Sequence, residues 1–479
     1  MGFKARTVNF NVEVRVKMNK IRFLMFITMA AFAAALYCCR LPEVESQFNM
    51  KVLLPLAAGG NPPVTEYIIS VSLKGNKYEA HKLFSSTSRT IKMAAPIDEE
   101  ITISIAAFPA APSETPTLYF GNFPVNKTER YKVEPINNNV SIELLESQKE
   151  MAEGGMIFFI PGTGGSWDEM HVFEFTTSNA VQYLTFKKNG IETAPNIYGR
   201  LLVVGGGGAG GSSSGVALGA GGGGGGGAVI IDDNFRFNSA KYRITVGKSD
   251  EDSLFGDTSS YKYKAIHGGK GGNAATTPGP GLPSSENPTP TATTKVKGGA
   301  GGGASVFNSP VVSWSSGGTA ANGDGGALSE GWQGGDGATL AVAGGGGGGQ
   351  ISTGISGDSA PLSNPISGMQ YGGYGGHGGN GKSATITGKI VYFGAGGGAG
   401  GTKEAGHGGR KGAEGESGSG GRSNFAANMA GKDGVSGRMS NPDAGAGGGG
   451  GGGASATGTA NGGQGGKGIV IVRFQYQLP

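Results

Sequence analysis

One stretch of the chain, Gly376 to Ser383, matches the phosphate-binding pattern GxxxxGKS letter for letter. In that motif, backbone N–H groups and the start of a helix hold phosphate, so a strand must precede it and a helix must follow. Here Ala384 to Thr387 indicate a strand where the helix should begin. We therefore expect a chance match in a glycine-dense region, and we keep a nucleotide-binding enzyme only as a remote alternative.

A second glycine motif imitates a dinucleotide-binding fold. Gly205 to Gly210 follows the apolar run Leu201 to Val204, and Asp232 stands roughly where the ribose-binding acid would. The required helix would contain Gly221 to Gly227, and each glycine costs a helix about 1 kcal/mol relative to alanine. The dinucleotide interpretation therefore fails.

The remaining reactive side chains form no recognisable constellation. The five histidines show no metal-ligand spacing and have no cysteine beside them: His81, His171, His267, His377 and His407. Glycine–aspartate pieces such as Gly334 to Gly337 do not complete a calcium-binding nonapeptide. We expect no catalytic residue, no metal and no cofactor, and hence a protein that is not an enzyme.

The elements that would position any site are dominated by glycine. Of the 97 glycines, 12 lie in residues 1–200 and 85 in residues 201–479. Ordering Gly221 to Gly227 costs roughly 7–14 kcal/mol of backbone entropy, and no side chain is present to offset it. Either such runs are disordered linkers, or they are left-handed extended helices with three residues per turn that hydrogen-bond sideways to one another. Strand-like pieces recur through the region and end with Ile469 to Phe474, so we expect order. Strict collagen periodicity is absent.

Longer, glycine-poorer inserts interrupt these runs at 273–297, 304–316, 351–370 and 422–444. Aromatic residues dominate binding hot spots. The candidate recognition residues of this region are therefore its aromatic residues Phe307, Trp314, Trp332, Tyr371 and Tyr374. The alternative is that these rings only pack over the glycine runs.

The amino terminus predicts export. Lys17, Lys20 and Arg22 precede the uncharged stretch Phe23 to Tyr37, which is shorter than the ~20 residues of a spanning helix. Residues 1–39 thus indicate a signal peptide that starts at Met18, with an uncleaved anchor as the alternative.

Both cysteines follow this apolar stretch, so no disulfide framework is available later in the chain. Leu36 stands three residues before Cys39, as in a lipoprotein signal. Cys39 is therefore the candidate lipidated residue and Cys38 its alternative, while ordinary cleavage nearby fits equally well.

Removal of the signal changes the charge balance. The whole chain has 39 Lys and Arg and 35 Asp and Glu. Residues 1–39 contain six of the basic residues and one of the acidic residues, so the rest of the chain has 33 basic and 34 acidic residues and a net charge of −1. Such a chain lacks the basic surface of a nucleic-acid binder. We expect no nucleic-acid partner, and membrane contact only through the signal or a lipid anchor.

Two further regions precede the glycine-rich part. Residues 40–150 contain short β-branched segments, such as Ile101 to Ile105 and Val140 to Leu144, and predict an immunoglobulin-like β-sandwich. Residues 151–165 predict a connecting strand and turn, and residues 166–479 the glycine-rich domain.

Motifs in a fixed order across about residues 166–476 resemble the glycine-rich domain family found in bacterial surface proteins and phage tail adhesins. They are an aromatic-rich strand (His171 to Phe175), a strand running into glycine (Leu201 to Gly207), two short steps (Thr245 to Gly247 and Ser253 to Gly256) and a closing strand (Gly466 to Arg473). The resemblance implies a jelly-roll-like β base capped by packed polyglycine II helices, with loops at the helix ends that contact host surface molecules in phage adhesins. The Pro/Thr-rich insert 274–297 departs from the family pattern.

The sequence as a whole predicts an all-β protein with an N-terminal sandwich and a glycine-rich domain. The expected function is that of an exported, non-enzymatic surface protein that presents loops for adhesion or for recognition of a surface glycan or protein ligand. The alternative is a structural component of the envelope or matrix without a specific ligand.

Overall fold

The computed structural model describes strand backbones between residues 45 and 146 and between residues 295 and 374. With gaps, it also describes side chains in 111–114, 152–274, 345–350, 375–401 and 430–475, together with Gly303 and Asp336. In these parts the chain consists of β-strands and one 3-10 helix, η2 (Pro442–Ala444), which confirms the all-β class. Among the described residues, no helix is long and apolar enough to cross a membrane. Chain contacts divide the protein into two units, and most of the second is formed by residues 146–479.

The first unit is built on eight strands. Their order in the sheet is β3-β2-β5-β6-β8-β1-β4, with β7 beside β5. The first strand pairs antiparallel with β4 and parallel with β8. The predicted segments Ile101 to Ile105 and Val140 to Leu144 lie in β5 and β8, whereas the sequence did not predict β1, β3 and β4. The strands are β1 (Glu45–Leu53), β2 (Tyr67–Lys74), β3 (Glu79–Phe84), β4 (Ser88–Pro96), β5 (Glu100–Pro109), β6 (Tyr119–Gly121), β7 (Arg130–Lys132) and β8 (Asn138–Glu146).

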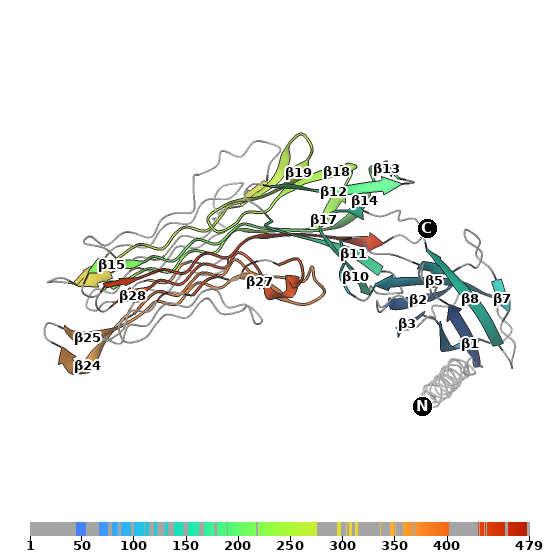
Figure 1. Ribbon diagram of the computed structural model, residues 1–479, viewed down its shortest axis with the longest axis horizontal. Helices are drawn as coiled ribbons and strands as arrows, with labels where there is room; N and C mark the ends of the chain where they lie inside the picture. Colours follow the sequence, from blue (N-terminus) through green and yellow to red (C-terminus); the bar gives the residue numbers. More distant parts are fainter. Residues whose placement is uncertain are drawn as a thin grey trace, which may run out of the picture. The chain divides into compact units, whose positions relative to one another are not determined.

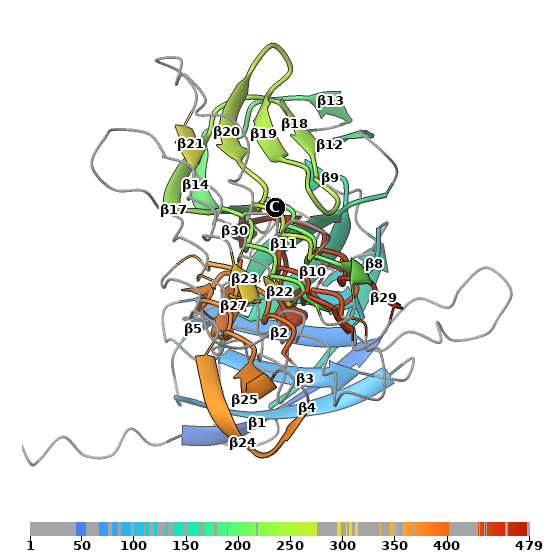
Figure 2. The ribbon, with the colours of Figure 1, turned by 90° about the vertical axis from the view of Figure 1, so that its left-hand side faces the viewer.

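The second unit begins with two packed sheets (Figures 1 and 2). We call them the base sheet and the cover sheet. The base sheet has the antiparallel order β10 (Met156–Pro161), β11 (Trp167–Glu174), β30 (Ile469–Tyr476), β14 (Ile197–Val204) and β17 (Val229–Phe237). The cover sheet has the order β13 (Ile191–Glu192), β12 (Val181–Lys188), β18 (Lys241–Thr245), β19 (Ser253–Asp257), β20 (Tyr261–Ala265) and β21 (Lys295–Lys297), with β9 (Ala152–Glu153) beside β12.

The expected connector, residues 151–165, supplies strands to both sheets. In it, β9 joins the cover sheet and β10 the base sheet. In addition, residues 107–119, which we expected in the first domain, cluster with the second unit. Ser113 and Ile157 exchange two backbone hydrogen bonds of 3.2 and 2.9 Å. The contact-based division of the chain therefore differs from the expected boundaries at both places.

The base sheet is buried on both faces at Leu201–Val204, which explains this unbroken apolar run. Leu201 and Val203 face the cover sheet and pack with rings such as Phe237 and Phe255. Leu202 and Val204 face the other way and pack against a hairpin formed by β26 (Lys382–Ala384) and β27 (Val391–Phe393). Since successive strand residues point to opposite faces, a strand buried on both sides has no polar alternation.

Among the described residues, eight glycine segments run side by side. We call them the glycine bundle: residues 205–211, 221–227, 268–272, 345–348, 376–381, 394–400, 445–453 and 462–468. At the ends of the segments away from the base sheet lie short strands (Figure 1). These are β15 (Ser213–Val216), β16 (Gly219–Ala220), β22 (Val306–Asn308), β23 (Val312–Trp314), β24 (Asp358–Ile366), β25 (Met369–Tyr374), β28 (Ala454–Ser455) and β29 (Gly458–Ala460). We call this region the far end.

Candidate functional site

The run Gly221–Gly227 lies at the centre of the glycine bundle, and its successive N–H groups point to three different neighbours in turn. The partner segment repeats at every third residue, with N···O distances of 2.8–3.0 Å. Gly221, Gly224 and Gly227 donate to Gly453, Gly450 and Gly447; Gly222, Gly225 and Ala228 donate to Gly272, Gly269 and Ile266; Gly223 and Gly226 donate to Gly345 and Gly348. A backbone with three residues per turn produces this rotation.

The carbonyl groups of the same run accept hydrogen bonds from three further neighbours. The donors are Gly208 and Gly211 of one segment, Gly397 and Gly400 of another, and Gly303. Among the described residues, the central run thus has six hydrogen-bonded neighbours. All seven N–H groups of the buried run, and the carbonyl groups of Gly221 to Gly225, are in this way satisfied by other backbones.

Glycine is required here because the neighbouring chains are too close for a side chain. A Cβ atom at Gly224 would lie 2.0 Å from the carbonyl oxygen of Gly208, and one at Gly223 would lie 2.0 Å from that of Gly397. The φ angles at both positions lie outside the left-handed region. Close approach of the backbones, and not backbone conformation, therefore excludes larger residues.

Segments at the edge of the bundle carry one larger residue in every three. The pattern X-G-G occurs around Lys270, His377 and Gln464, with buried glycines and with these three side chains exposed. We had noted only that strict collagen periodicity is absent. This short local period was the sequence signal that we missed, and it marks which side of each edge segment faces solvent.

Side-chain oxygens satisfy outward-pointing N–H groups at the edge of the bundle. Asp250 accepts from Ala209 N at 3.0 Å, Asn273 from Ser212 N at 2.8 Å and Asp433 from Gln464 N at 2.8 Å. Residues 432–434 also bond to the bundle, since Gly451 N donates to Lys432 O and Gly434 N donates to Gln464 O. The insert 422–444 is therefore partly a bundle segment, at residues 432–434.

The candidate recognition residues fall at the far end, in two groups. Phe307 lies in β22 opposite Gly219, and Trp314 lies in β23 opposite Val306, both in a four-stranded sheet with β16 and β28. Tyr371 and Tyr374 lie in β25, opposite Pro361 and Asp358 of β24. Trp332, Cys38 and Cys39 lie outside the described residues. The structure thus places four of the five aromatic candidates in hairpins, two in each.

The two glycine motifs, Gly376 to Ser383 and Gly205 to Gly210, do not have the surroundings that a nucleotide-binding site requires. In the GxxxxGKS stretch, Gly379 N donates to Gly347 O at 2.8 Å, and the chain continues from Gly381 into β26 and not into a helix. In the dinucleotide-like stretch, Gly207 and Gly208 donate to Gly466 and Gly225. These N–H groups are therefore occupied by carbonyl groups and are not available to phosphate.

A fully buried histidine–glutamate pair lies on β11. His171 Nε2 and Glu169 Oε1 are 2.6 Å apart, and His171 Nδ1 lies 2.7 Å from Gly154 O. The side chains are 0% and 1% exposed, and the imidazole stacks on Phe474. Both ring nitrogens of His171 therefore face oxygen atoms, one of a side chain and one of the backbone. The pair is enclosed on all sides, so a structural role fits it better than catalysis.

A second polar cluster joins Asp252, His267 and Lys264 near the base of the bundle. His267 Nδ1 lies 2.8 Å from Asp252 Oδ1, His267 N donates to the same oxygen at 2.9 Å, and Lys264 Nζ lies 2.9 Å from Asp252 Oδ2. Burial by itself would raise the pKa of Asp252, but these hydrogen bonds and the Lys264 charge outweigh it and lower the pKa to about 2. The cluster fixes the turn between β20 and the 268–272 segment.

Within the described part of the chain, no group of three or more His, Cys, Asp or Glu residues is placed to hold a metal ion. Comparisons with protein-family models, with curated proteins and with solved structures find no match to this chain.

Proposed function

We propose that this chain is an exported, non-enzymatic surface protein in which a polyglycine II bundle holds recognition hairpins away from a β base. The observation that carries the proposal is the three-residue rotation of hydrogen-bond partners along Gly221–Gly227. A bundle cross-linked in six directions keeps the far end at a fixed distance and orientation. Rigid presentation reduces the ordering cost of binding, which suits a recognition protein.

The other parts of the proposal rest on patterns in the sequence. The eight-stranded first unit serves as an immunoglobulin-like spacer or binding module, and residues 1–39 direct export, with Cys39 as the lipidated residue. The partner is a surface glycan or a surface protein, recognised through Phe307, Trp314, Trp332, Tyr371 and Tyr374. Mass spectrometry of the mature amino terminus tests cleavage of the signal and lipidation at Cys39; an unprocessed Met1 or Met18 terminus contradicts both.

A binding screen with matched variants tests the recognition role. The wild-type chain is screened against a glycan array and intact cell surfaces, followed by the double variants Phe307→Ala/Trp314→Ala and Tyr371→Ala/Tyr374→Ala. Loss of a hot-spot aromatic costs about 2 kcal/mol or more, so we expect at least roughly 30-fold weaker binding from one double variant. Tyr198→Ala, at a 58% exposed tyrosine of the base sheet, is the control and should bind as wild type.

The outcomes separate the two function classes. Binding that survives both double variants and Trp332→Ala rules out these five aromatic residues as the recognition surface. A chain that binds no surface at all while its bundle stays folded supports the structural envelope or matrix role instead.

A further inference from the structure

The outward face of the cover sheet carries a row of side chains across β12, β18, β19 and β20, four strands that lie side by side in Figure 2. Tyr183 of β12 pairs with Arg243 of β18. Gly256 of β19 pairs with Arg243 on one side and with Tyr261 of β20 on the other. The two strand neighbours of Arg243 are fully buried in the core, so the row itself faces outward.

Arg243 is held in place by an aromatic ring. Its guanidinium carbon lies 4.8 Å from the centre of the Tyr261 ring, within the range of a cation–π interaction. The Tyr261 hydroxyl lies 3.1 Å from Thr245 Oγ1. Gly256 places no side chain between Arg243 and Tyr261, and a Cβ atom there would lie 2.1 Å from Ser260 O. A guanidinium group fixed on a ring loses less freedom when it binds a ligand.

The charge of Arg243 is accessible and is not compensated by a neighbouring acid. Within the described part of the chain, Arg243 contacts the Tyr261 ring but no carboxylate. Its Nε atom is buried, whereas the residue is partly exposed, so the accessible end is that of the two Nη nitrogens. Four lysines of the same sheet, in contrast, pair with carboxylates: Lys187 with Glu153, Lys241 with Glu192, Lys262 with Asp257 and Lys264 with Asp252.

Tyr183 adds an accessible ring beside this cation. It is 43% exposed, and Lys241 Nζ lies 4.7 Å from its ring centre. Directly paired side chains have Cβ atoms about 4.5–5.5 Å apart, so a ligand of the size of one sugar unit can touch both Tyr183 and Arg243. A guanidinium group binds a carboxylate through two parallel hydrogen bonds, and a tyrosine ring offers apolar surface to C–H groups.

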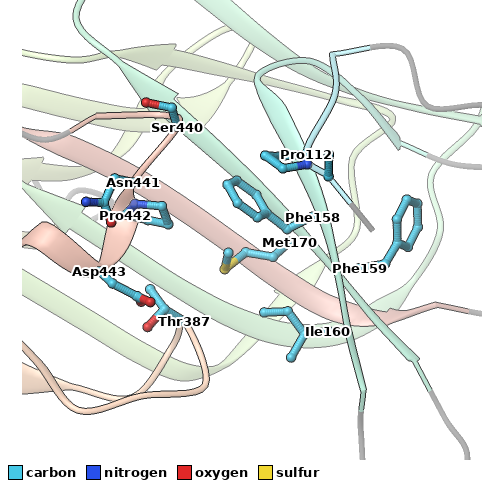
Figure 3. A pocket seen from close by; sticks show the side chains of 11 residues that line it. Pro112, Phe158, Phe159, Ile160, Met170, Thr387, Ser440, Asn441, Pro442 and Asp443 are labelled. Atoms are coloured by element: carbon cyan, nitrogen blue, oxygen red, sulfur yellow. The ribbon is translucent and has the colours of Figure 1, made fainter. Parts of the chain in front are cut away.

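The small pocket beneath β10 and β11 offers no comparable group (Figure 3). Its floor consists of Phe158, Ile160 and Met170. Asp443 is the one charged residue among the described residues that line it. Asp443 Oδ1 is buried, and Asp443 Oδ2 lies 2.9 Å from Lys389 Nζ. The cover sheet, in contrast, presents a charge that a ligand can reach.

We infer that Arg243 and Tyr183 of the cover sheet bind a carboxylated sugar, with the carboxylate on the Arg243 guanidinium group and the sugar ring against Tyr183. An acidic side chain of a peptide would also satisfy the cation, but it would leave the Tyr183 ring without a contact. A sugar acid carries its carboxylate on the ring, so one unit reaches both groups. The site is separate from the far-end hairpins, and it does not depend on whether those hairpins recognise a ligand.

Isothermal titration calorimetry of the full chain at low ionic strength tests the site, since salt screens an exposed ion pair. The probes are tetragalacturonate, which consists of uronic acids, and sialyllactose, which ends in a sialic acid. We expect saturable binding of at least one of them. Arg243→Gln should weaken that binding about tenfold or more, because it removes the charged donors. Arg243→Lys should weaken it as well, because lysine lacks the planar fork. Tyr183→Ala should weaken it, while Tyr183→Phe, which keeps the ring, should not.

Lys187→Gln is the matched control. It lowers the net charge of the same sheet by the same amount as Arg243→Gln, but Lys187 is already paired with Glu153. We expect this variant to bind as wild type. Equal weakening by Lys187→Gln and Arg243→Gln would show attraction by net charge alone and overturn the inference. Thermal unfolding shows whether each variant is folded, and Arg243→Lys and Tyr183→Ala carry the test if Arg243→Gln does not fold.

The remaining outcomes concern the ligand. The inference is overturned if neither probe binds at concentrations well above millimolar. Methyl-esterified tetragalacturonate that binds as tightly as the acid would show that no carboxylate is recognised. Tetraglutamate that binds as tightly as either sugar would identify a site for acidic peptides and refute the sugar assignment.

Discussion

Replacing one central glycine by alanine adds a single methyl group, but it should disrupt the bundle strongly. In Gly224→Ala the new Cβ would lie 2.0 Å from Gly208 O, and real Cβ atoms essentially never come closer than 3.0 Å to such an atom. The two segments must therefore separate by about 1 Å. That movement breaks three hydrogen bonds of 2.8–2.9 Å, donated by Gly205, Gly208 and Gly211 to the 221–228 stretch. At about 1 kcal/mol per bond, with an added cost for unsatisfied buried groups, we expect a loss of roughly 3–5 kcal/mol.

Chemical denaturation of the full chain, followed by far-ultraviolet circular dichroism, measures this loss. Gln464→Ala is the matched control, because it also changes a bundle residue but at an exposed third position. We expect the control to stay within about 0.5 kcal/mol of wild type. If Gly224→Ala unfolds at the same denaturant concentration as wild type and control, close backbone packing is not what requires glycine.

Two further predictions concern the buried polar groups. The pKa of Asp252 is lowered to about 2 in the folded protein. Its contribution to the free energy of unfolding is therefore present above the unfolded pKa of about 4 and is lost as the pH falls towards 2. Asp252→Asn should cost about 2 kcal/mol at pH 7. Urea unfolding at several pH values checks this, and an unchanged acid dependence in Asp252→Asn contradicts it. His171→Leu leaves Glu169 buried without its partner and should cost about 3–5 kcal/mol, whereas the double change Glu169→Leu/His171→Leu should recover most of that stability. A double variant no more stable than His171→Leu, measured in the same way, would refute this reading of the pair.

The strands of the second unit could be predicted from the sequence because buried strands consist of apolar residues. Ile469 to Phe474 and Leu201 to Val204 are apolar without interruption, and in the structure both lie in a sheet that is covered on each face. The connector 151–165 was harder, because the short strand Ala152–Glu153 has no distinctive composition and gains its place only by pairing with β12.

The pairing within the bundle could not be predicted in the same way. A run of glycines carries no side-chain information on which other run it contacts, so nothing in Gly221–Gly227 indicates Gly447, Gly269 or Gly345 as partners. What the sequence does record is the geometry at the edge, where an X-G-G period around Lys270, His377 and Gln464 reflects three residues per turn. The sequence did not show that the insert 422–444 joins the bundle, because Lys432 and Gly434 do so through backbone atoms.

Site-resolved amide hydrogen exchange of Gly221–Gly227 in the full chain tests the bundle most directly. Every one of these seven N–H groups donates to another segment, so all seven should exchange slowly, without the alternation expected at the edge of a β-sheet. Fast exchange along the whole run, or protection of only every second amide, would contradict the account.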